Sequence, residues 1–312
     1  MARILVIGGA HIDRRATLKS TAIAGASNPG KWNEEPGGGG FNAARNLANL
    51  GNRVAMVSVR GGDEAGERVG EAMESHGIQD MAQVFLDRAT PSYSAVLDRN
   101  GDLVIAVADM DLYDRFVDRQ LSRKSIRLAV AEAEYVLCDA NLPAETLAAL
   151  SKMTARQNTP LAAIAISPAK APRLSLAFDR LSVLFLNAAE AGALCGQPTG
   201  PQDWPAQLRN LGVARAVITQ GPGPIYGFDG GTVFRFTPPV ATEIADVTGA
   251  GDALAAATIH ALARGEDLAG AVRHGIAAAT LAMRSPHASP PELSAGWVQQ
   301  AIERIPGAEI LS

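Results

Sequence analysis

Short apolar runs alternate with longer helical stretches along most of the chain. The runs are rich in β-branched residues and end at glycine or polar residues; they span Arg3–Ile7, Arg53–Val59, Glu134–Cys138, Leu161–Ile166, Val183–Leu186 and Ala216–Thr219. They are continuously apolar rather than alternating, which is typical of parallel strands that helices cover on both faces. Helical patterns cover Asp63–His76, Pro143–Arg156, Gly249–Arg264, Asp267–Met283 and Ser294–Ile305. The order predicts an α/β fold with a doubly wound, mostly parallel sheet.

Two segments interrupt this rhythm. Ser92–Asp98 and Asp102–Ala108 flank the turn Arg99-Asn100-Gly101, and Asn-Gly is a strong signal for an antiparallel hairpin. The stretch Asp13–Pro36 is polar, is punctuated by Gly and Pro, and contains short strand-like pieces. Neither segment suits a parallel sheet, so we interpret them together as a small β-flap that projects from the main domain. Two unrelated surface excursions are the alternative that the pattern leaves open.

Composition narrows the class of protein. The chain has 312 residues, 28 Lys plus Arg and 32 Asp plus Glu, so its net charge of −4 has the wrong sign for a general nucleic-acid binder. No apolar run reaches the ~18 residues that span a bilayer. The start, MARILVIGGA, does not have the pattern of a signal peptide, and two cysteines, Cys138 and Cys195, exclude a disulfide scaffold. We therefore expect a cytoplasmic protein with neither nucleic-acid nor membrane partners.

The sharpest chemical signal is the segment Asp246–Asp252 (DVTGAGD), which leads into the helix predicted to begin at Gly249. Small residues let main-chain amides approach a ligand closely, and a helix N-terminus binds anions, phosphate above all. Asp252 would repel that phosphate, so its fitting role is a base for an attacking hydroxyl. An ordinary Asp, with a pKa of ~3.9, would be ionised at neutral pH. Taken alone, the segment is equally compatible with a turn whose aspartate stabilises the helix start.

A second glycine-rich loop, Gly37–Gly40, precedes a helix predicted over Ala43–Leu50. Consecutive glycines permit close approach of a ligand, and the Asn42 amide can donate to and accept from hydroxyl groups. We interpret this loop as a substrate loop.

The alternative for this loop is a dinucleotide fingerprint. Gly38, Gly40 and Ala43 fit GxGxxA, and Asp63 follows 20 residues after Ala43. That fingerprint must directly follow a strand, and Lys31–Pro36 is no buried strand. The hypothesis of a dinucleotide-dependent oxidoreductase depends on this sequence match alone.

A third motif, Asn187–Glu190 (NAAE), follows the strand predicted over Val183–Leu186. Ligands of open α/β sheets gather at the carboxyl ends of the strands, and a Glu there could hold Mg²⁺ through water. A glutamate that merely stabilises a helix start is the alternative. The chain contains no P-loop, nucleophile-elbow or zincin motif.

These motifs, in this order, resemble the ribokinase-like (PfkB-type) carbohydrate kinase family. The matching segments run over essentially the whole chain and are GGAHID, PGGGGFNAARNLANLG, the hairpin, NAAE, VITQGPG and DVTGAGDAL. The resemblance implies phosphoryl transfer from ATP to a primary hydroxyl by a single domain, residues 1–312, with a Rossmann-like sheet. It also implies a β-sheet lid, formed by about 13–36 and 91–110, through which relatives often form homodimers.

Roles are carried over by position in these motifs. Asp252 resembles the catalytic base, and Gly249, Ala250 and Gly251 resemble the anion hole. Residues matching substrate contacts are Asp13, Gly38, Gly39, Asn42, Tyr93 and Asn141. Residues matching the nucleotide site are Asn187, Thr219, Gly221 and Gly223. Glu190 matches a Mg²⁺ position, and Asp246 and Thr248 fall where many relatives bind K⁺.

The substrate is implied less directly. Ribokinases commonly have Lys where this chain has Gly39, which argues against ribose. The hairpin, CDANLP and ISPAKAPRL resemble the pseudouridine kinase branch of the family. The glycine loop has no Lys or Arg for a phosphorylated sugar, which favours a neutral nucleoside. Lys31 and Arg14, near the flap, keep a phosphorylated sugar as an alternative. Ribose, adenosine or a ketose stay alternative substrates, and a non-catalytic nucleoside- or sugar-binding regulator is the alternative of a different class.

Overall fold

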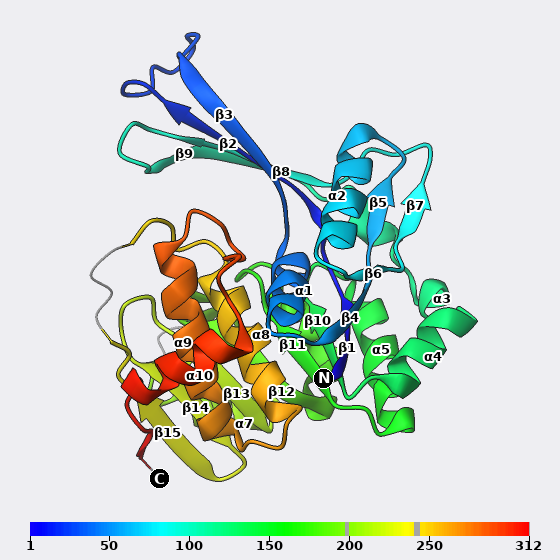
Figure 1. Cartoon of the computed structure of the whole chain (residues 1–312), viewed down its shortest axis with the longest axis vertical. Coiled ribbons are helices and arrows are strands. Elements are labelled where there is room, and N and C mark those ends of the chain that lie inside the picture. The colour runs from blue at the N-terminus through cyan, green and yellow to red at the C-terminus, as the bar shows by residue number, and fades with distance from the viewer. Residues whose placement is uncertain (197–199, 240–243, 312) are drawn as a thin grey trace.

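The computed structural model describes residues 1–196, 200–239 and 244–311 and centres on one large sheet (Figure 1). Its strand order is β16-β15-β14-β13-β12-β11-β10-β1-β4-β6. The parallel strands are β1 (Arg3–Ile7), β4 (Arg53–Val57), β6 (Gln79–Asp80), β10 (Tyr135–Asp139), β11 (Leu161–Ile164), β12 (Leu181–Asn187) and β13 (Arg215–Thr219). The antiparallel strands at one edge are β14 (Ile225–Asp229), β15 (Thr232–Phe236) and β16 (Glu309–Ile310). The predicted mostly parallel sheet is confirmed.

Helices cover both faces of this sheet. One face packs against α1 (Gly39–Asn49), α2 (Glu64–Ser75), α8 (Ala250–Leu262), α9 (Leu268–Arg284) and α10 (Ala295–Ala301), which η3 (Ile302–Arg304) follows. The other packs against η1 (Asp111–Arg115), α3 (Asp118–Leu121), α4 (Lys124–Glu132), α5 (Ala144–Gln157), η2 (Ala171–Arg180), α6 (Ala188–Cys195) and α7 (Trp204–Asn210). Successive side chains of a strand point to opposite faces of the sheet. In β1, Ile4 and Val6 therefore pack into the hydrophobic core beneath α1 and α8, while Leu5 and Ile7 pack into the core on the opposite face. This explains why the strands are apolar throughout.

The two segments that interrupt the sequence pattern pair in one small sheet, which projects from the main body (Figure 1). Its order is β3-β2-β8-β9, formed by β2 (His11–Leu18), β3 (Gly30–Gly37), β8 (Ser92–Leu97) and β9 (Leu103–Asp109). The predicted hairpin is β8–β9, and β2 joins it through parallel pairing with β8. The alternative of two unrelated excursions is therefore wrong.

Several element boundaries differ from the sequence pattern, and two of these differences change how the fold is put together. The apolar run Arg53–Val59 is not one strand: β4 ends at Val57, and β5 (Val59–Gly61) pairs with β7 (Gln83–Phe85) in a separate sheet. An apolar run does not reveal that its two halves have different partners. Helix α1 begins at Gly39 rather than Ala43, because the buried carboxylate of Asp139, at the end of β10, accepts a hydrogen bond from the Gly40 amide.

Within the described part of the chain, none of the helices combines the length and apolar character that a membrane span requires.

Candidate active site

The predicted site residues gather at the carboxyl ends of the parallel strands, where α1 and α8 also begin. Ligands of open α/β sheets bind at this edge. Asn187 at the end of β12 is in register with Thr219 at the end of β13. On the acceptor side, Asn141 follows the end of β10 and Asp13 lies on β2.

Asp252 lies in the first turn of α8 and meets the glycine loop, although 210 residues separate it from Asn42. The Asn42 side-chain amide donates a hydrogen bond to Asp252 Oδ2 at 2.9 Å. A Cβ atom on Gly39 would lie 3.3 Å from Asp252 Oδ1, so the absence of a side chain keeps this carboxylate accessible. Gly249, the residue before α8, has φ of +79°, a conformation that glycine adopts without strain.

The ionisation of Asp252 differs from the expectation for an ordinary aspartate. Its pKa is raised to about 7, chiefly by burial and partly by the nearby carboxylates of Asp139 and Asp13, while the Asn42 hydrogen bond and the Arg45 charge act in the opposite direction. The expected full ionisation of Asp252 at neutral pH is therefore wrong. A base with a pKa near neutrality is well matched to proton abstraction from a hydroxyl.

The acceptor side of the edge is polar and pre-organised. Asp13 Oδ1 lies 3.2 Å from His11 Nε2, and the other ring nitrogen of His11 lies 2.8 Å from the Tyr113 hydroxyl. Tyr93 on β8 is in register with Asp13 on β2, so both side chains emerge from the same face of the small sheet. Asn42 is 4% exposed and also accepts a hydrogen bond from Arg45 at 2.7 Å.

Sequence reasoning missed several residues at this edge. Asp139, Lys170 and Arg173 all contact Asn141: the Asn141 amides donate to Asp139, Lys170 Nζ donates to Asn141 Oδ1 at 2.6 Å, and Arg173 donates to the Asn141 carbonyl. Their signal was present in CDANLP and ISPAKAPRL, which place charged residues just after predicted strands. The glycine loop itself contains no Lys or Arg, but the segment after β11 brings Lys170 and Arg173 to this edge of the sheet.

On the nucleotide side, Asn187 and Glu190 form a reciprocal cap at the start of α6. Asn187 Oδ1 accepts from the Glu190 amide, and the Glu190 carboxylate accepts from the Asn187 main chain and side chain at 2.8 and 3.0 Å. Burial raises the pKa of Glu190. Both of its oxygens are already hydrogen-bonded, so the residue fits contact with Mg²⁺ through water rather than directly.

The remaining nucleotide positions form a turn after β13. Gly221 has φ of +57°, and the Gly223 amide donates to the Gln220 carbonyl at 3.0 Å. Among the described residues, no group of three or more His, Cys, Asp or Glu side chains is arranged to hold a metal ion.

Asp246 is already paired with a cation from the small sheet. Its Oδ2 lies 2.6 Å from Arg15 Nη1, and its Oδ1 accepts from the Thr248 amide at 2.8 Å. A guanidinium in contact with the carboxylate repels a second cation. In this arrangement Asp246 and Thr248 do not fit the K⁺ site that the resemblance implied.

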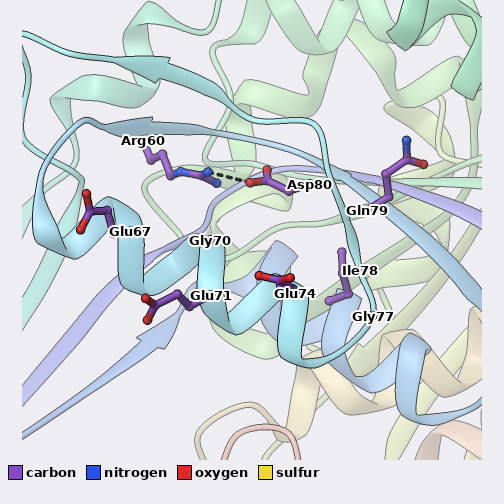
Figure 2. A pocket seen from close by; sticks show the side chains of 9 residues that line it. All are labelled: Arg60, Glu67, Gly70, Glu71, Glu74, Gly77, Ile78, Gln79 and Asp80. Carbon is purple, nitrogen blue, oxygen red and sulfur yellow. Dashed lines mark ion pairs between the residues drawn. The ribbon is translucent and has the colours of Figure 1, made fainter.

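A surface pocket away from these residues is shown in Figure 2. It lies between α2 and the segment Gly77–Asp80 and is lined by Glu67, Glu71, Glu74 and the Arg60–Asp80 ion pair. None of the predicted site residues lines it, so it is separate from the candidate active site.

The dinucleotide alternative for the glycine loop is wrong on geometry. The strand before this loop is β3, an edge strand of the small sheet that is mostly exposed. Asp63 instead accepts from the Gly66 amide as the cap of α2 and from the Thr90 amide.

Comparison with known proteins gives one consistent result. The profile of the pfkB family carbohydrate kinases matches residues 1–295. Pseudouridine kinase of Escherichia coli (strain K12) is 27% identical over 314 residues, covering 99% of this chain and 98% of that protein. Ribokinase of Bacillus subtilis (strain 168) is 27% identical, covering 91% of this chain and 94% of that protein.

Solved structures agree with this assignment. A carbohydrate kinase from Agrobacterium tumefaciens is 48% identical with a TM-score of 0.89, and the match covers both chains completely. Arabidopsis thaliana ribokinase, complexed with ribose and ATP, has a TM-score of 0.86 at 20% identity, covers 97% of this chain and 99% of that chain, and supports the fold alone. This chain belongs to the pfkB family of carbohydrate kinases, which makes it an enzyme that transfers a phosphoryl group to the hydroxyl of a small sugar or nucleoside.

Proposed function

We propose that this kinase phosphorylates the 5′-hydroxyl of a nucleoside, with pseudouridine as the preferred acceptor and ATP as the donor. The observation that carries the proposal is the position of Asp252. Its carboxylate lies at the start of α8 and contacts Asn42 in the first turn of α1, directly after the glycine loop, so it stands between an anion-binding helix start and an acceptor loop.

In the proposed mechanism, Asp13, Asn42 and the main chain at Gly38 and Gly39 hold the acceptor. Asp252 takes the proton from the attacking hydroxyl as the oxygen approaches the terminal phosphorus of ATP in line. The phosphorus–oxygen bond to the attacking hydroxyl forms as the bond to the ADP leaving group breaks.

The main-chain amides at Gly249, Ala250 and Gly251 stabilise the charge on the transferring group. Glu190 would hold Mg²⁺ through water, and the ion would supply further neutralisation of phosphate charge. Asn187, Thr219, Gly221 and Gly223 are proposed to line the nucleotide site.

A nucleoside acceptor is favoured by the polar groups beyond the sugar position. Asn141 and Lys170 offer an amide and an ammonium group, and Tyr93 lies on the face of the small sheet that carries Asp13. A base with carbonyl and N–H groups finds partners there that a simple sugar would not use. Likeness to pseudouridine kinase over nearly the whole chain also supports this choice, although ribokinase is similarly close in identity.

The small sheet is proposed to act as a lid and as a dimer contact of this single-domain chain. Arg15 reaches Asp246, so the neighbouring Ala16 faces away from the site, as do its register partners Trp32 and Val96. Trp32 is 60% exposed on this outer face. An apolar face on an open sheet suits pairing with a second copy.

A cytoplasmic location stays a prediction.

An ADP-release assay tests the proposed substrate. Pseudouridine, uridine, adenosine, ribose and fructose are compared at equal concentration with ATP and Mg²⁺, and the product is identified by mass spectrometry. We expect pseudouridine to give the highest kcat/KM and a 5′-monophosphate product. Preference for ribose or fructose would overturn the nucleoside proposal, and ADP release that no acceptor stimulates would overturn the kinase mechanism.

A further inference from the structure

Asp139, the last residue of β10, is a completely buried carboxylate that the proposed mechanism does not use. Its Oδ2 accepts hydrogen bonds from the Gly9 amide and the Gly40 amide, both at 2.9 Å, and from Asn141 Nδ2 at 3.0 Å. Its Oδ1 accepts from the Asn141 amide at 2.9 Å. No described cation forms an ion pair with it, so donated hydrogen bonds compensate its burial.

Besides its neighbour Asn141, Asp139 holds groups from two segments far from it in the sequence. Gly9 lies between β1 and β2, the strand that carries Asp13. Gly40 lies in the first turn of α1, directly before the part of the helix that carries Asn42. Each of these segments contributes a proposed acceptor contact.

Helix α1 depends on this arrangement for its start. The residue before it, Gly38, provides no side-chain cap, and the first turn of α1 contains no acidic residue. A carboxylate from β10 takes both roles, because it accepts a first-turn amide and places a negative charge at the positive end of the helix.

We propose that Asp139 is a positioning residue of the acceptor site. Its carboxylate ties Gly9, Gly40 and Asn141 together and so fixes the acceptor hydroxyl relative to Asp252. This inference rests on the proposed function, because it assigns a role in the same site.

Asp139 also acts on Asp252 through its charge. The pKa of Asp252 is raised first by burial and then by the negative charges of Asp139 and Asp13, while Asn42 and Arg45 act in the opposite direction. Removal of the Asp139 charge therefore lowers the pKa of Asp252. A residue that supports only the fold would leave that pKa where it is.

The test compares Asp139→Asn with the wild-type enzyme on the best acceptor from the assay above. The variant keeps the shape but loses the charge and turns one acceptor atom into a donor that faces N–H groups. We expect acceptor KM to rise by about 10-fold or more, since small misplacements of reacting groups are costly, while ATP KM stays nearly constant. We also expect the acid limb of the kcat/KM profile to move to lower pH.

Asp63→Asn is the matched control. Asp63 likewise holds a helix-start amide, that of Gly66, and a second segment through Thr90, but its charge is not among those that shift the pKa of Asp252. This control should lose thermal stability without moving the acid limb. Asp139→Glu keeps the charge and disturbs the geometry, so it should raise acceptor KM and leave the limb in place.

The two proposals fail in different ways. A wild-type enzyme that phosphorylates none of the acceptors contradicts the proposed function. An active wild type together with a folded Asp139→Asn variant of unchanged acceptor KM and acid limb contradicts the positioning role. If both Asp139 variants fail to fold, hydrogen exchange on the wild type decides: protected Gly9 and Gly40 amides that exchange still more slowly with acceptor support the role, and rapid exchange contradicts it.

Discussion

Helices α1 and α8 begin side by side at the same edge of the sheet, and each follows a glycine that provides no side-chain cap. At α1, the Gly40 amide bonds to Asp139 and the Phe41 amide bonds to the Gly9 carbonyl. At α8, the Ala250 amide bonds to the Val247 carbonyl at 3.3 Å, whereas the Gly251 and Asp252 amides have no hydrogen-bond partner among the described residues. One helix start is closed by the protein itself, and the other is open.

This difference matches the two ligands that the site is proposed to hold. A neutral acceptor needs a rigid loop, which the paired Gly40 and Phe41 amides provide, so that its hydroxyls meet fixed partners. A transferring phosphoryl group needs unsatisfied amides, because these supply its stabilisation. Asp252 lies at the open start and touches Asn42 of the closed one.

The largest expected effect comes from the residue between the two helix starts. Asp252→Asn keeps the shape of the side chain but removes the base, so kcat should fall by at least ~10²-fold. Steady-state kinetics measure the fall, and circular dichroism checks that the fold is intact. A near-normal rate in a folded variant would remove Asp252 from the mechanism.

The second-largest effect is expected from pH, which changes the ionisation of Asp252 at the open start of α8. Proton binding inactivates a base, and the pKa of Asp252 is raised to about 7, so kcat/KM should rise with pH through about 7. Below that value the rate should fall roughly tenfold per pH unit, in proportion to the ionised fraction. A profile measured from pH 5 to 9 that stays flat through 7 would contradict this assignment.

Crowding the open start should have a moderate effect. Ala250→Val places a branched side chain beside the amides of Gly249 and Gly251, and we expect ATP KM to rise by roughly 10-fold, less than the ~10²–10³ that loss of one oxyanion-hole donor costs. The acceptor KM should change little, since the closed start of α1 is untouched. Unchanged ATP kinetics would count against the anion hole.

The smallest effect is expected from monovalent cations. Arg15 already neutralises Asp246, just before the start of α8. Replacing K⁺ by Na⁺ at constant ionic strength should therefore change kcat by less than about twofold, because a nearby positive charge disfavours a second one. As a control, Arg15→Ala should make both the rate and the thermal unfolding temperature more sensitive to K⁺. Strong activation of the wild-type enzyme by K⁺ would contradict this prediction and show that the Arg15–Asp246 ion pair opens.

Much of the architecture was predictable because it depends on local sequence. Continuous apolar runs such as Arg3–Ile7 indicate strands that are buried on both faces, and Asn100-Gly101 indicates the hairpin between β8 and β9. The start of α8 at Gly249–Asp252 was also visible, since glycine and a first-turn acid mark a helix N-terminus.

Tertiary packing decided which strands pair and which side chains meet in the site. The division of the run Arg53–Val59 between two sheets depends on which strands lie beside it, and the pKa of Asp252 depends on burial and on carboxylates from β2 and β10. Asp139 lies within CDANLP, but only the folded chain shows that it joins Gly9 and Gly40 to its own segment. The sequence by itself determined the strands, the helix starts and the glycine-rich loops, because hydrogen bonding and side-chain periodicity act over a few residues. Only the tertiary structure decided which helix start is open and which is closed, because that depends on a partner about a hundred residues away.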